Sequence, residues 1–416
     1  MAKVSPLENS PPPEGPVLIR QGEPSTAARR PRILIDASPV TSSVDGLSVY
    51  IVNLIKHLPE ASLDWFDYTI LLNPGVDWPD LAKAVRERGL KELRARIAPI
   101  GPRRDLDMLR FLRRHRGQFD LIHITSNNYP LALRGGICTI HDVTFRTWFD
   151  SKSRVPLWKF AARLYMSMVI RKALKRAQAV IAVSDSTRRD IERQFAPGRA
   201  EMAKISIVHE GWEHLNDYDR EECPPFEFGA GGYIFFLGSY RVHKNLTRLL
   251  EAFRLAMDRI PSDRILVISG SSGALSAANQ QVLATINAVR QRVVFTGYVS
   301  NACVSRLYAE ADAFIFPSLS EGFGLPVLEA FHFGTPLLCS RATSLPEVAG
   351  DAALYFDPDD AGDIAEAIVR FYNDPTLAAK LGAAGSRRLA SFSWTKAAAE
   401  TVEIYRRCLA GAGAPL

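Results

Sequence analysis

Two carboxylates flank a glycine-rich turn in the stretch SEGFGLPVLE, residues 320–329. Gly322 and Gly324 stand just before the expected start of a helix, where free N–H groups and the helix dipole favour a bound phosphate. Glu321 lies at the mouth of this turn and can accept hydrogen bonds from sugar hydroxyls. Glu329 falls within the first helical turns and can hold the diol of a ribose. Together these residue types suit the binding of a nucleotide sugar.

The acidic residues also have a purely structural interpretation. Glu321 could cap the helix and Glu329 could be a solvated helix position, because two glutamates eight positions apart are weak evidence of a site. A second acidic motif, FDPDDAGD, gives Asp357 and Asp359 the D-x-D spacing of metal-dependent transferases. Because this motif directly precedes an expected helix, we interpret Asp359 or Asp360 as a helix cap and expect no metal site.

The composition is that of an ordinary soluble globular protein. The 416 residues are 47% apolar and 23% charged, and the length favours two or three domains. The net charge of +6 fits anionic small molecules or an anionic membrane surface better than nucleic acid. We find no signal peptide and no apolar run long enough to cross a bilayer.

The five cysteines are few and widely spaced. They form no Cys-x-x-Cys pair and no Cys/His ligand pattern. We therefore expect neither a disulfide framework nor a zinc site, and we expect a reducing, cytoplasmic compartment. The cysteines are Cys138, Cys223, Cys303, Cys339 and Cys408.

Apolar runs typical of buried strands alternate with helical patterns along the chain, which predicts βαβ units and parallel sheets. Two such series are separated by a stretch that loses the apolar rhythm. The predicted fold class is α/β, with two doubly wound Rossmann-like domains facing a cleft. The expected organisation is a disordered tail at 1–30, an N-terminal acceptor domain at 31–209, a linker at 210–229, a C-terminal nucleotide-sugar-binding domain at 230–393 and a last helix at 394–416 that returns to the N-terminal domain.

The glycine-rich stretch resembles the E-x7-E signature of the retaining GT-B glycosyltransferases of family 4, the group 1 glycosyltransferases. Other segments are similar to the same family, and the similarity covers most of the chain after residue 31. They read AVIAVSDSTRRDI, FLGSYRVHKNLTRLLEAF, VVFTGYVS and LYAEADAFIFPSLSEGFGLPVLEAFHFGTPLLCSRATSLPEVAGDAALYFDP. The resemblance implies a GT-B fold, retention of the anomeric configuration and no cofactor besides the nucleotide-sugar donor.

The resemblance also assigns roles to the positions that match the family's motifs. Glu321 would contact the donor sugar, Glu329 the ribose, and Lys244 the departing diphosphate. The amides of Gly322 to Leu325 would meet the sugar and the diphosphate. The implied catalytic residues are Glu321, Lys244, His141 and Arg241, and the implied donor-binding residues are Gly322, Phe323, Gly324, Leu325, Glu329, Gly238, His243 and Gly46.

Some of these positions follow the family pattern loosely. The family often has an arginine a few residues before the lysine; Arg241 is nearby in a different register, so His243 could assist instead. His141, in IHD, matches a histidine near the donor sugar, although it could also be a satisfied histidine at a strand end. Gly46 matches the glycine loop after the first strand, but Val49 stands where relatives often have arginine.

The segments HKN, EGWEH and YVSNACVSRLYAEADAFIFPS look most like the bacterial mannosyltransferase branch. This resemblance favours GDP-mannose as donor and a glycan or polyprenyl-linked acceptor, with UDP-glucose, UDP-galactose or an N-acetylhexosamine donor as alternatives. Two other readings stay open: a nucleotide-sugar epimerase, and a catalytically silent scaffold for a partner transferase. We expect no nucleic-acid partner.

A basic, aromatic stretch between 148 and 176 predicts a helix from about 156 to 177 that could rest on anionic lipid at the inner face of the cell membrane. A second basic segment at 103–116 could add to such a patch. The alternative is a helix that packs its apolar side on the N-terminal sheet and solvates its charges.

Overall fold

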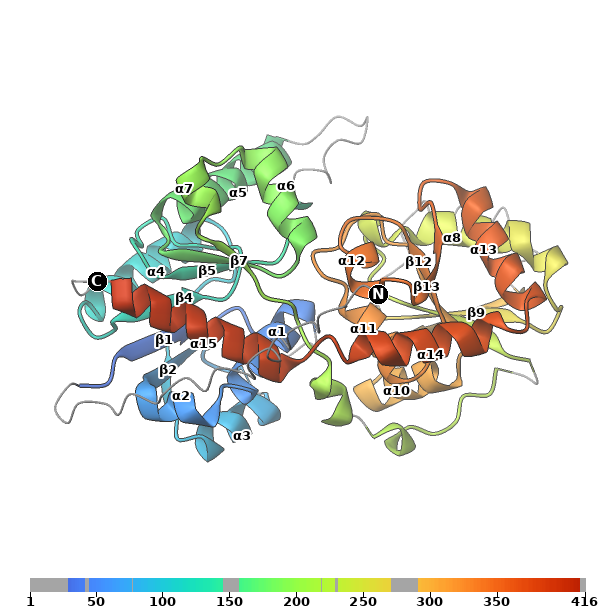
Figure 1. Cartoon of the computed structure of the whole chain (residues 1–416), viewed down its shortest axis with the longest axis horizontal. Helices are drawn as coiled ribbons and strands as arrows, with labels where there is room; N and C mark the ends of the chain where they lie inside the picture. The colour runs from blue at the N-terminus through green and yellow to red at the C-terminus, as the bar shows by residue number, and fades with distance from the viewer. Residues whose placement is uncertain are drawn as a thin grey trace, which may run out of the picture. The chain divides into compact units, whose positions relative to one another are not determined.

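The computed structural model describes residues 29–41, 45–76, 78–144, 157–217, 219–228, 231–270 and 291–411. Nearly all of the predicted tail at 1–30 lies outside these residues. So does the stretch 276–290, for which the sequence pattern predicts a helix. In the described part of the chain, two parallel sheets each carry helices on both faces (Figure 1). This arrangement confirms the predicted doubly wound α/β class.

The first sheet contains seven parallel strands in the order β3-β2-β1-β4-β5-β6-β7. Its strand β1 is buried on both faces, because Ile33 and Ile35 join one core cluster and Leu34 joins another. The bounds are β1 Arg32–Asp36, β2 Asp67–Leu72, β3 Lys91–Arg94, β4 Leu121–Ile124, β5 Ile137–Ile140, β6 Ala179–Ala182 and β7 Ile205–Ile207. From β1 the chain adds β2 and β3 on one side of the sheet, and from β4 it adds β5, β6 and β7 on the other side. The carboxyl ends of the neighbouring strands β1 and β4 therefore form a topological switch point.

The helices of the first domain begin at recognisable caps. Asp45 caps α1 by accepting a hydrogen bond from the N–H of Ser48, and Ser184 caps α6 by accepting one from the N–H of Thr187. Helix α6 therefore begins at Asp185, the residue directly after its cap. The helices are α1 Gly46–Lys56, α2 Glu60–Trp65, α3 Pro79–Glu87, α4 Pro102–Arg114, α5 Leu157–Arg176, α6 Asp185–Phe195 and α7 Arg199–Met202.

The second sheet contains six parallel strands in the order β10-β9-β8-β11-β12-β13, with a switch point between β8 and β11. The strands are β8 Tyr233–Leu237, β9 Ile265–Ser269, β10 Val293–Gly297, β11 Ala313–Phe316, β12 Leu337–Ser340 and β13 Ala353–Phe356. The helices are α8 Leu246–Ala256, α10 Asn301–Glu310, α11 Leu325–His332, α12 Leu345–Ala349, α13 Ala361–Asn373 and α14 Leu377–Leu389. Asp360 caps α13 by accepting a hydrogen bond from the N–H of Gly362, which confirms the cap interpretation of the FDPDDAGD motif.

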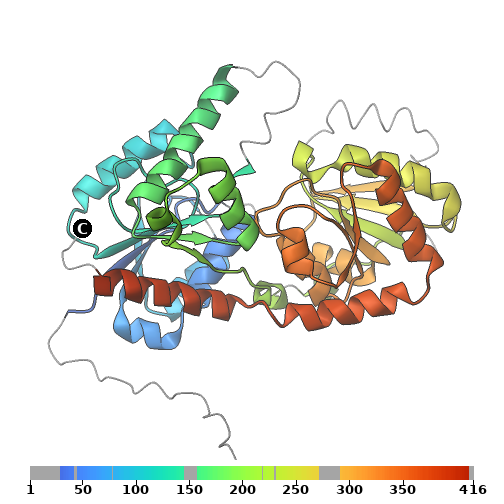
Figure 2. The same cartoon turned by 45° about the horizontal axis from the view of Figure 1, so that its top comes forward.

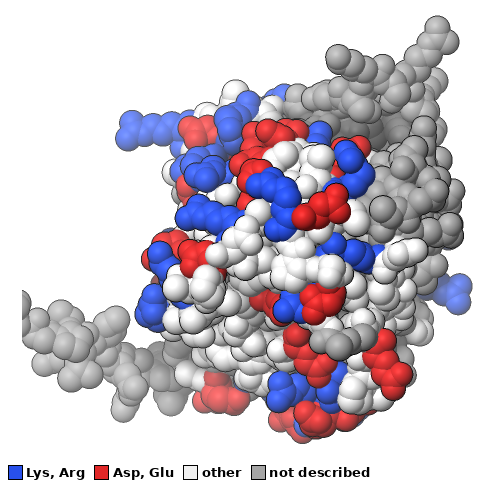
Figure 3. All heavy atoms as spheres, turned by 90° about the vertical axis from the view of Figure 1, so that its right-hand side faces the viewer, with Lys and Arg blue, Asp and Glu red and all other residues white. Residues whose placement is uncertain are grey.

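The surface of the second domain mixes both signs of charge. On the face shown in Figure 3, Lys and Arg side chains are interspersed with Asp and Glu. Exposed pairs such as Arg259 with Glu366 and Arg248 with Asp359 belong to this domain. Pairs of this kind add little to stability, so we take them as surface solvation and not as a site.

The last helix, α15 (Trp394–Gly411), packs against α1 and β4 of the first domain. Its Trp394 is fully buried, and the ring of Tyr405 packs beside His123, with Tyr405 Oη 2.7 Å from His123 Nδ1. Burial of these large aromatic side chains explains why the chain returns to the first sheet after completing the second.

The expectation that the chain has no disulfide is wrong for one pair. Cys223 and Cys303 are disulfide-bonded, 80 residues apart in sequence. Cys223 follows the 3-10 turn Arg220–Glu222, which packs against α10, and Cys303 lies in the first turn of α10. The bond therefore ties the predicted linker to the second domain, a proximity that the sequence spacing could not indicate.

Among the described residues, none of the helices is both long enough and apolar enough to span a membrane.

Candidate functional site

A cavity of about 640 Å³ lies at the carboxyl ends of strands from both sheets. Its wall is made by the segments that follow β5 to β11, together with the start of α1. All twelve residues predicted for the site line it: His141, Glu321, Lys244, Arg241, Gly322, Phe323, Gly324, Leu325, Glu329, Gly238, His243 and Gly46. The structure thus brings them together, while their individual roles stay predictions.

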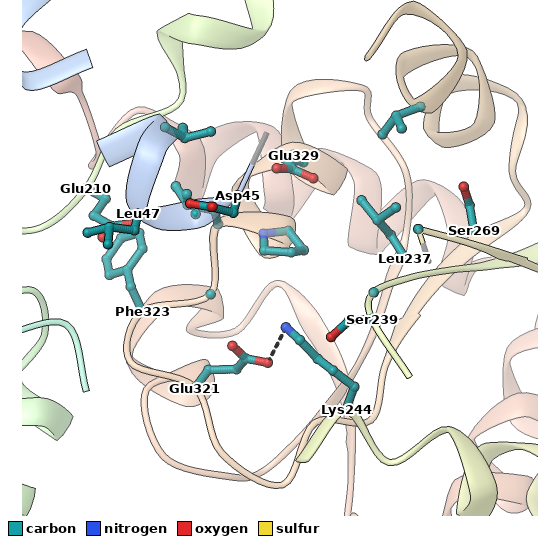
Figure 4. A pocket seen from close by; sticks show the side chains of 18 of the residues that line it. Asp45, Leu47, Glu210, Leu237, Ser239, Lys244, Ser269, Glu321, Phe323 and Glu329 are labelled. Atoms are coloured by element: carbon teal, nitrogen blue, oxygen red, sulfur yellow. Dashed lines mark hydrogen bonds and ion pairs between the residues drawn. The ribbon is translucent and has the colours of Figure 1, made fainter. Parts of the chain in front are cut away.

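An ion pair between Lys244 and Glu321 crosses the cavity (Figure 4). Lys244 Nζ lies 2.8 Å from Glu321 Oε1, and the two side chains are only 16% and 14% exposed. Lys244 ends a 3-10 turn after β8 and also lies over the ring of Phe316, 5.1 Å from its centre. The next residue, Asn245, fixes this turn by donating side-chain hydrogen bonds to the carbonyls of Pro317 and Pro358.

The backbone around Glu321 is held by the loop that precedes α12. The N–H of Glu321 donates to Thr343 Oγ1 at 2.9 Å, and Ser344 Oγ donates to the carbonyls of Glu321 and Phe323. Thr343 adopts a left-handed φ of 46°, which is costly for a β-branched residue. A strained loop thus fixes Glu321, and no feature of the signature stretch itself pointed to Thr343 or Ser344.

Helix α11 begins at the glycine-rich turn without a side-chain cap. Its N-cap Gly324 has a φ of 106°, a conformation that other residues rarely adopt, and Pro326 occupies the first turn. The N-terminus of an uncapped helix is a suitable place for an anion. The N-terminal end of α11 therefore faces the cavity.

Glu329 lies one turn into α11, on the opposite wall from Lys244 in Figure 4. Tyr308 Oη donates a hydrogen bond to Glu329 Oε2 at 2.8 Å. Burial raises the pKa of Glu329 to about 7, although the Tyr308 hydrogen bond and the charge of Lys244 each lower it. This carboxyl therefore gains and loses its proton near neutral pH.

His141 contributes from the end of β5, and its ring is held by neighbours on several sides. Its Nε2 donates to the carbonyl of Thr125 at 3.0 Å, and its Nδ1 lies 3.5 Å from Glu210 Oε1. The ring of Tyr50 packs edge-on against it at 4.6 Å. Glu210 is buried and lines the cavity, yet the sequence analysis assigned it no role. Its only signal in the sequence was its place three residues after the end of β7.

The remaining predicted residues occupy the rim. Arg241 is exposed and begins the turn that ends in Lys244. His243 accepts a hydrogen bond from the N–H of Leu319 at its carbonyl, and burial lowers the pKa of its imidazole. The backbone of Gly238 passes close to the Lys244 side chain, and Gly46 opens α1.

The described ranges contain no group of three or more His, Cys, Asp or Glu side chains arranged to hold a metal ion. The site combines a largely buried ion pair, a carboxyl whose pKa burial raises to about 7, a histidine held by its neighbours and a helix N-terminus around a common cavity.

Two family models match the chain, one for each domain. Residues 44–214 match the model described as Glycosyltransferase Family 4, and residues 225–388 match the model described as Glycosyl transferases group 1. Both matched ranges contain predicted site residues.

Among curated proteins, the chain is 29% identical over 395 residues to O-antigen chain mannosyltransferase B of Escherichia coli, covering 90% of this chain and 99% of that protein. Among solved structures, it is similar to sucrose-phosphate synthase of Thermosynechococcus elongatus, with a TM-score of 0.68, 18% identity and coverage of 92% and 100% of the two chains. It is also similar to Anabaena HepE solved with UDP and glucose, with a TM-score of 0.66, 17% identity and coverage of 91% and 100%. At these identities the structural likenesses establish the fold.

Proposed function

The chain belongs to the group 1 glycosyltransferases of the GT-B fold, and from this premise we propose that it transfers mannose from GDP-mannose to a glycan or polyprenyl-linked acceptor. The transfer retains the anomeric configuration and needs no metal ion. The coarser function, a hexosyltransferase of polysaccharide biosynthesis, rests on the family and on the mannosyltransferase relatives. We propose that it works in the cytoplasm, at the inner face of the cell membrane.

The observation that carries this proposal is the Lys244–Glu321 ion pair beside the N-terminus of α11. Departure of a nucleoside diphosphate leaves negative charge on the phosphates and positive charge on the sugar ring. The ammonium of Lys244 and the amides at the start of α11 stabilise the first charge, because fixed dipoles and charges need no reorganisation during the reaction. Glu321 positions the sugar through its hydroxyls.

Retention follows in this scheme from attack on the face that the diphosphate leaves, with the diphosphate accepting the proton of the acceptor. A double-displacement mechanism would need a carboxylate nucleophile next to the anomeric carbon. Glu321 is paired with Lys244 and Glu329 with Tyr308, so we assign both carboxylates to binding.

The donor is tested by thermal shift against GDP, UDP, ADP and their sugars. We expect GDP-mannose to raise the melting temperature most, because a ligand that binds only the folded state stabilises it by mass action. A rise with UDP-sugars alone would overturn the mannosyl assignment and keep the transferase. Turnover of the donor with no acceptor dependence would favour an epimerase, and full biological activity of a folded Glu321→Ala variant would favour a scaffold.

Donor affinity should depend on pH through Glu329. Its carboxylate accepts hydrogen bonds from both ribose hydroxyls, whereas the protonated carboxyl must first lose its proton. Since the pKa of Glu329 is about 7, affinity for the nucleoside diphosphate should fall with decreasing pH below that value. The expected loss is up to about tenfold per pH unit, with a plateau above the pKa.

Calorimetric titration from about pH 5 to about pH 8 measures this dependence, and the Glu329→Gln variant is its control. The variant should bind more weakly at high pH and should keep only the pH dependence of the nucleotide's own phosphates. Equal slopes for the two proteins below pH 7 would show that Glu329 does not bind the ribose.

The membrane proposal rests on α5. Phe160, Leu164 and Met168 are 59%, 62% and 45% exposed and recur every four residues, which places them in one row. Exposed Arg171 and Lys175 continue the row along the helix. Helix α4 lies beside α5 in Figure 2, and Tyr165 Oη donates to Asp105 of α4. An apolar row that continues into basic residues fits an anionic lipid surface.

Replacement of Leu164 by Asp should weaken binding to phosphatidylglycerol vesicles about tenfold or more, since burying one Leu contributes about 1.5–3 kcal/mol. Leu255→Asp is the matched control, because Leu255 is also an exposed leucine, 41% exposed, and lies on α8 of the second domain. Vesicle sedimentation measures both. Equal vesicle binding of wild type and Leu164→Asp would show that this face of α5 does not contact lipid. It would support the alternative, in which the helix packs on the N-terminal sheet and its charges are solvated.

A further inference from the structure

A single carboxylate of the second domain is bound by three donors of the first. Glu347, in α12, accepts hydrogen bonds from the N–H of Asp185 at 2.7 Å and the N–H of Ser186 at 2.9 Å. His209 Nε2 lies 2.8 Å from Glu347 Oε1. The two N–H groups open helix α6, whose dipole also favours a negative charge at this end.

The pKa of Glu347 agrees with this geometry. Burial alone would raise the pKa of this carboxyl, but the hydrogen bonds from His209, Asp185 and Ser186 outweigh burial and lower it. Glu347 is therefore held as a carboxylate. Its backbone is fixed from behind, because Arg388 of α14 donates to the carbonyls of Glu347 and Val348.

The start of α6 and His209, which bind Glu347, also contact the glycine-rich turn. Ser184 Oγ, at the start of α6, donates to the carbonyl of Gly322 at 2.6 Å, and Thr187 Oγ1 lies within hydrogen-bond distance of the same oxygen. The ring of His209 packs near Phe323, with ring centres 5.9 Å apart. The first turn of α6 and His209 thus contact both Glu347 and the turn that carries Glu321.

The segment that leads into α12 connects these contacts to the candidate site. Thr343 and Ser344 hold the backbone of Glu321, and Glu347 follows three residues after Ser344. This short segment therefore contacts the first domain through Glu347 and positions Glu321 through Thr343 and Ser344.

We propose that Glu347 is a positioning residue, which latches the second domain onto α6 and His209 and thereby couples closure of the cleft to the placement of Glu321. This inference rests on the proposed function for its kinetic consequence only. The latch itself concerns only the contact between the two domains, so its effect on the radius of gyration can be measured without any sugar.

The test compares wild type with Glu347→Gln. Glutamine keeps the volume but removes the charge and turns one acceptor oxygen into an NH₂ donor that faces another donor. Small-angle X-ray scattering should give a larger radius of gyration for the variant. Turnover should fall about ten- to hundredfold, as expected for the loss of hydrogen bonds to a charged group. Affinity for the nucleoside diphosphate should stay within about twofold, because the latch lies outside the proposed phosphate and ribose contacts.

Two further variants make the result specific. His209→Ala should open the cleft as well, and its effect on turnover should not add to that of Glu347→Gln, because both remove one interaction. Glu366→Gln is the control, since Glu366 is an exposed glutamate of the same domain whose ion pair is with the exposed Arg259. It should change neither quantity.

An unchanged radius of gyration in Glu347→Gln, with or without a loss of turnover, would overturn the latch. Wild-type turnover in an opened variant would overturn the coupling to Glu321. Where no nucleotide sugar is turned over even by wild type, the proposed function fails, and the scattering comparison still decides whether Glu347 holds the domains together.

Discussion

Replacement of Lys244 by alanine should lower turnover about a hundred- to a thousandfold while the protein stays folded. Lys244 supplies the only lysine ammonium that lines the cavity among the described residues. Its side chain is 16% exposed, so its charge acts through a medium that screens it less than water does. The effect should fall on the rate of transfer more than on binding, because charge on the diphosphate grows as the bond to the sugar breaks.

The loss of turnover in Lys244→Ala has a second cause, which is the effect of the substitution on Glu321. Removing Lys244 leaves Glu321 without its 2.8 Å partner in a largely buried position. An unpaired buried carboxylate is costly, so Glu321 should move or bind a proton, and its contact with the sugar should weaken. A Lys244→Ala, Glu321→Ala double variant should therefore lose less than the sum of the two single losses.

Single-turnover kinetics with the donor found by thermal shift measures this prediction. Lys396→Ala is the control, because Lys396 is an exposed lysine of α15 whose nearest acidic partner, Glu400, is 4.0 Å away. It should behave as wild type. Transfer by Lys244→Ala within about threefold of wild type would show that the diphosphate is stabilised elsewhere, with exposed Arg241 as the first residue to examine.

The fold was predictable because its signals are local and repeat along the chain. Buried strands such as β1 are continuous apolar runs, and helices such as α13 begin at acidic caps. Strand β3 shows the limit, because its four residues carry no apolar pattern. Its sequence, KELR, is polar because it forms the edge of the sheet and pairs only with β2. An edge strand needs no apolar pattern, so its partner, not its own sequence, defines it.

The candidate site was predictable where its chemistry lies in one short segment. Glu321 and Glu329 could be recognised together because they lie eight residues apart, in one turn and in the helix that follows it. Glu210 and Thr343 could not, since each acts on a residue far away in sequence: Glu210 faces His141, and Thr343 holds the backbone of Glu321. The Cys223–Cys303 bond escaped prediction for the same reason.

Replacement of Gly322 by alanine should reduce turnover about a hundredfold or more by keeping the two domains apart. A Cβ on Gly322 would lie 1.9 Å from the carbonyl oxygen of His141, whereas real Cβ atoms essentially never come within 3.0 Å of another atom. The obstacle is backbone on both sides, so no side-chain rotation relieves it. The turn must withdraw by more than an ångström, and misplacement by about 1 Å can cost about a hundredfold in rate.

Gly198→Ala separates this steric effect from a general cost of replacing glycine. Gly198 has a φ of −69°, and an added Cβ there meets nothing within 4 Å. The control should keep wild-type turnover, and Gly322→Ala should melt near the wild-type temperature, because each domain retains its own core. Turnover of Gly322→Ala equal to that of Gly198→Ala would mean that transfer does not need the glycine-rich turn to meet His141. Loss of turnover with retained nucleotide binding would place the defect in that contact, where Glu347 and the first turn of α6 also act.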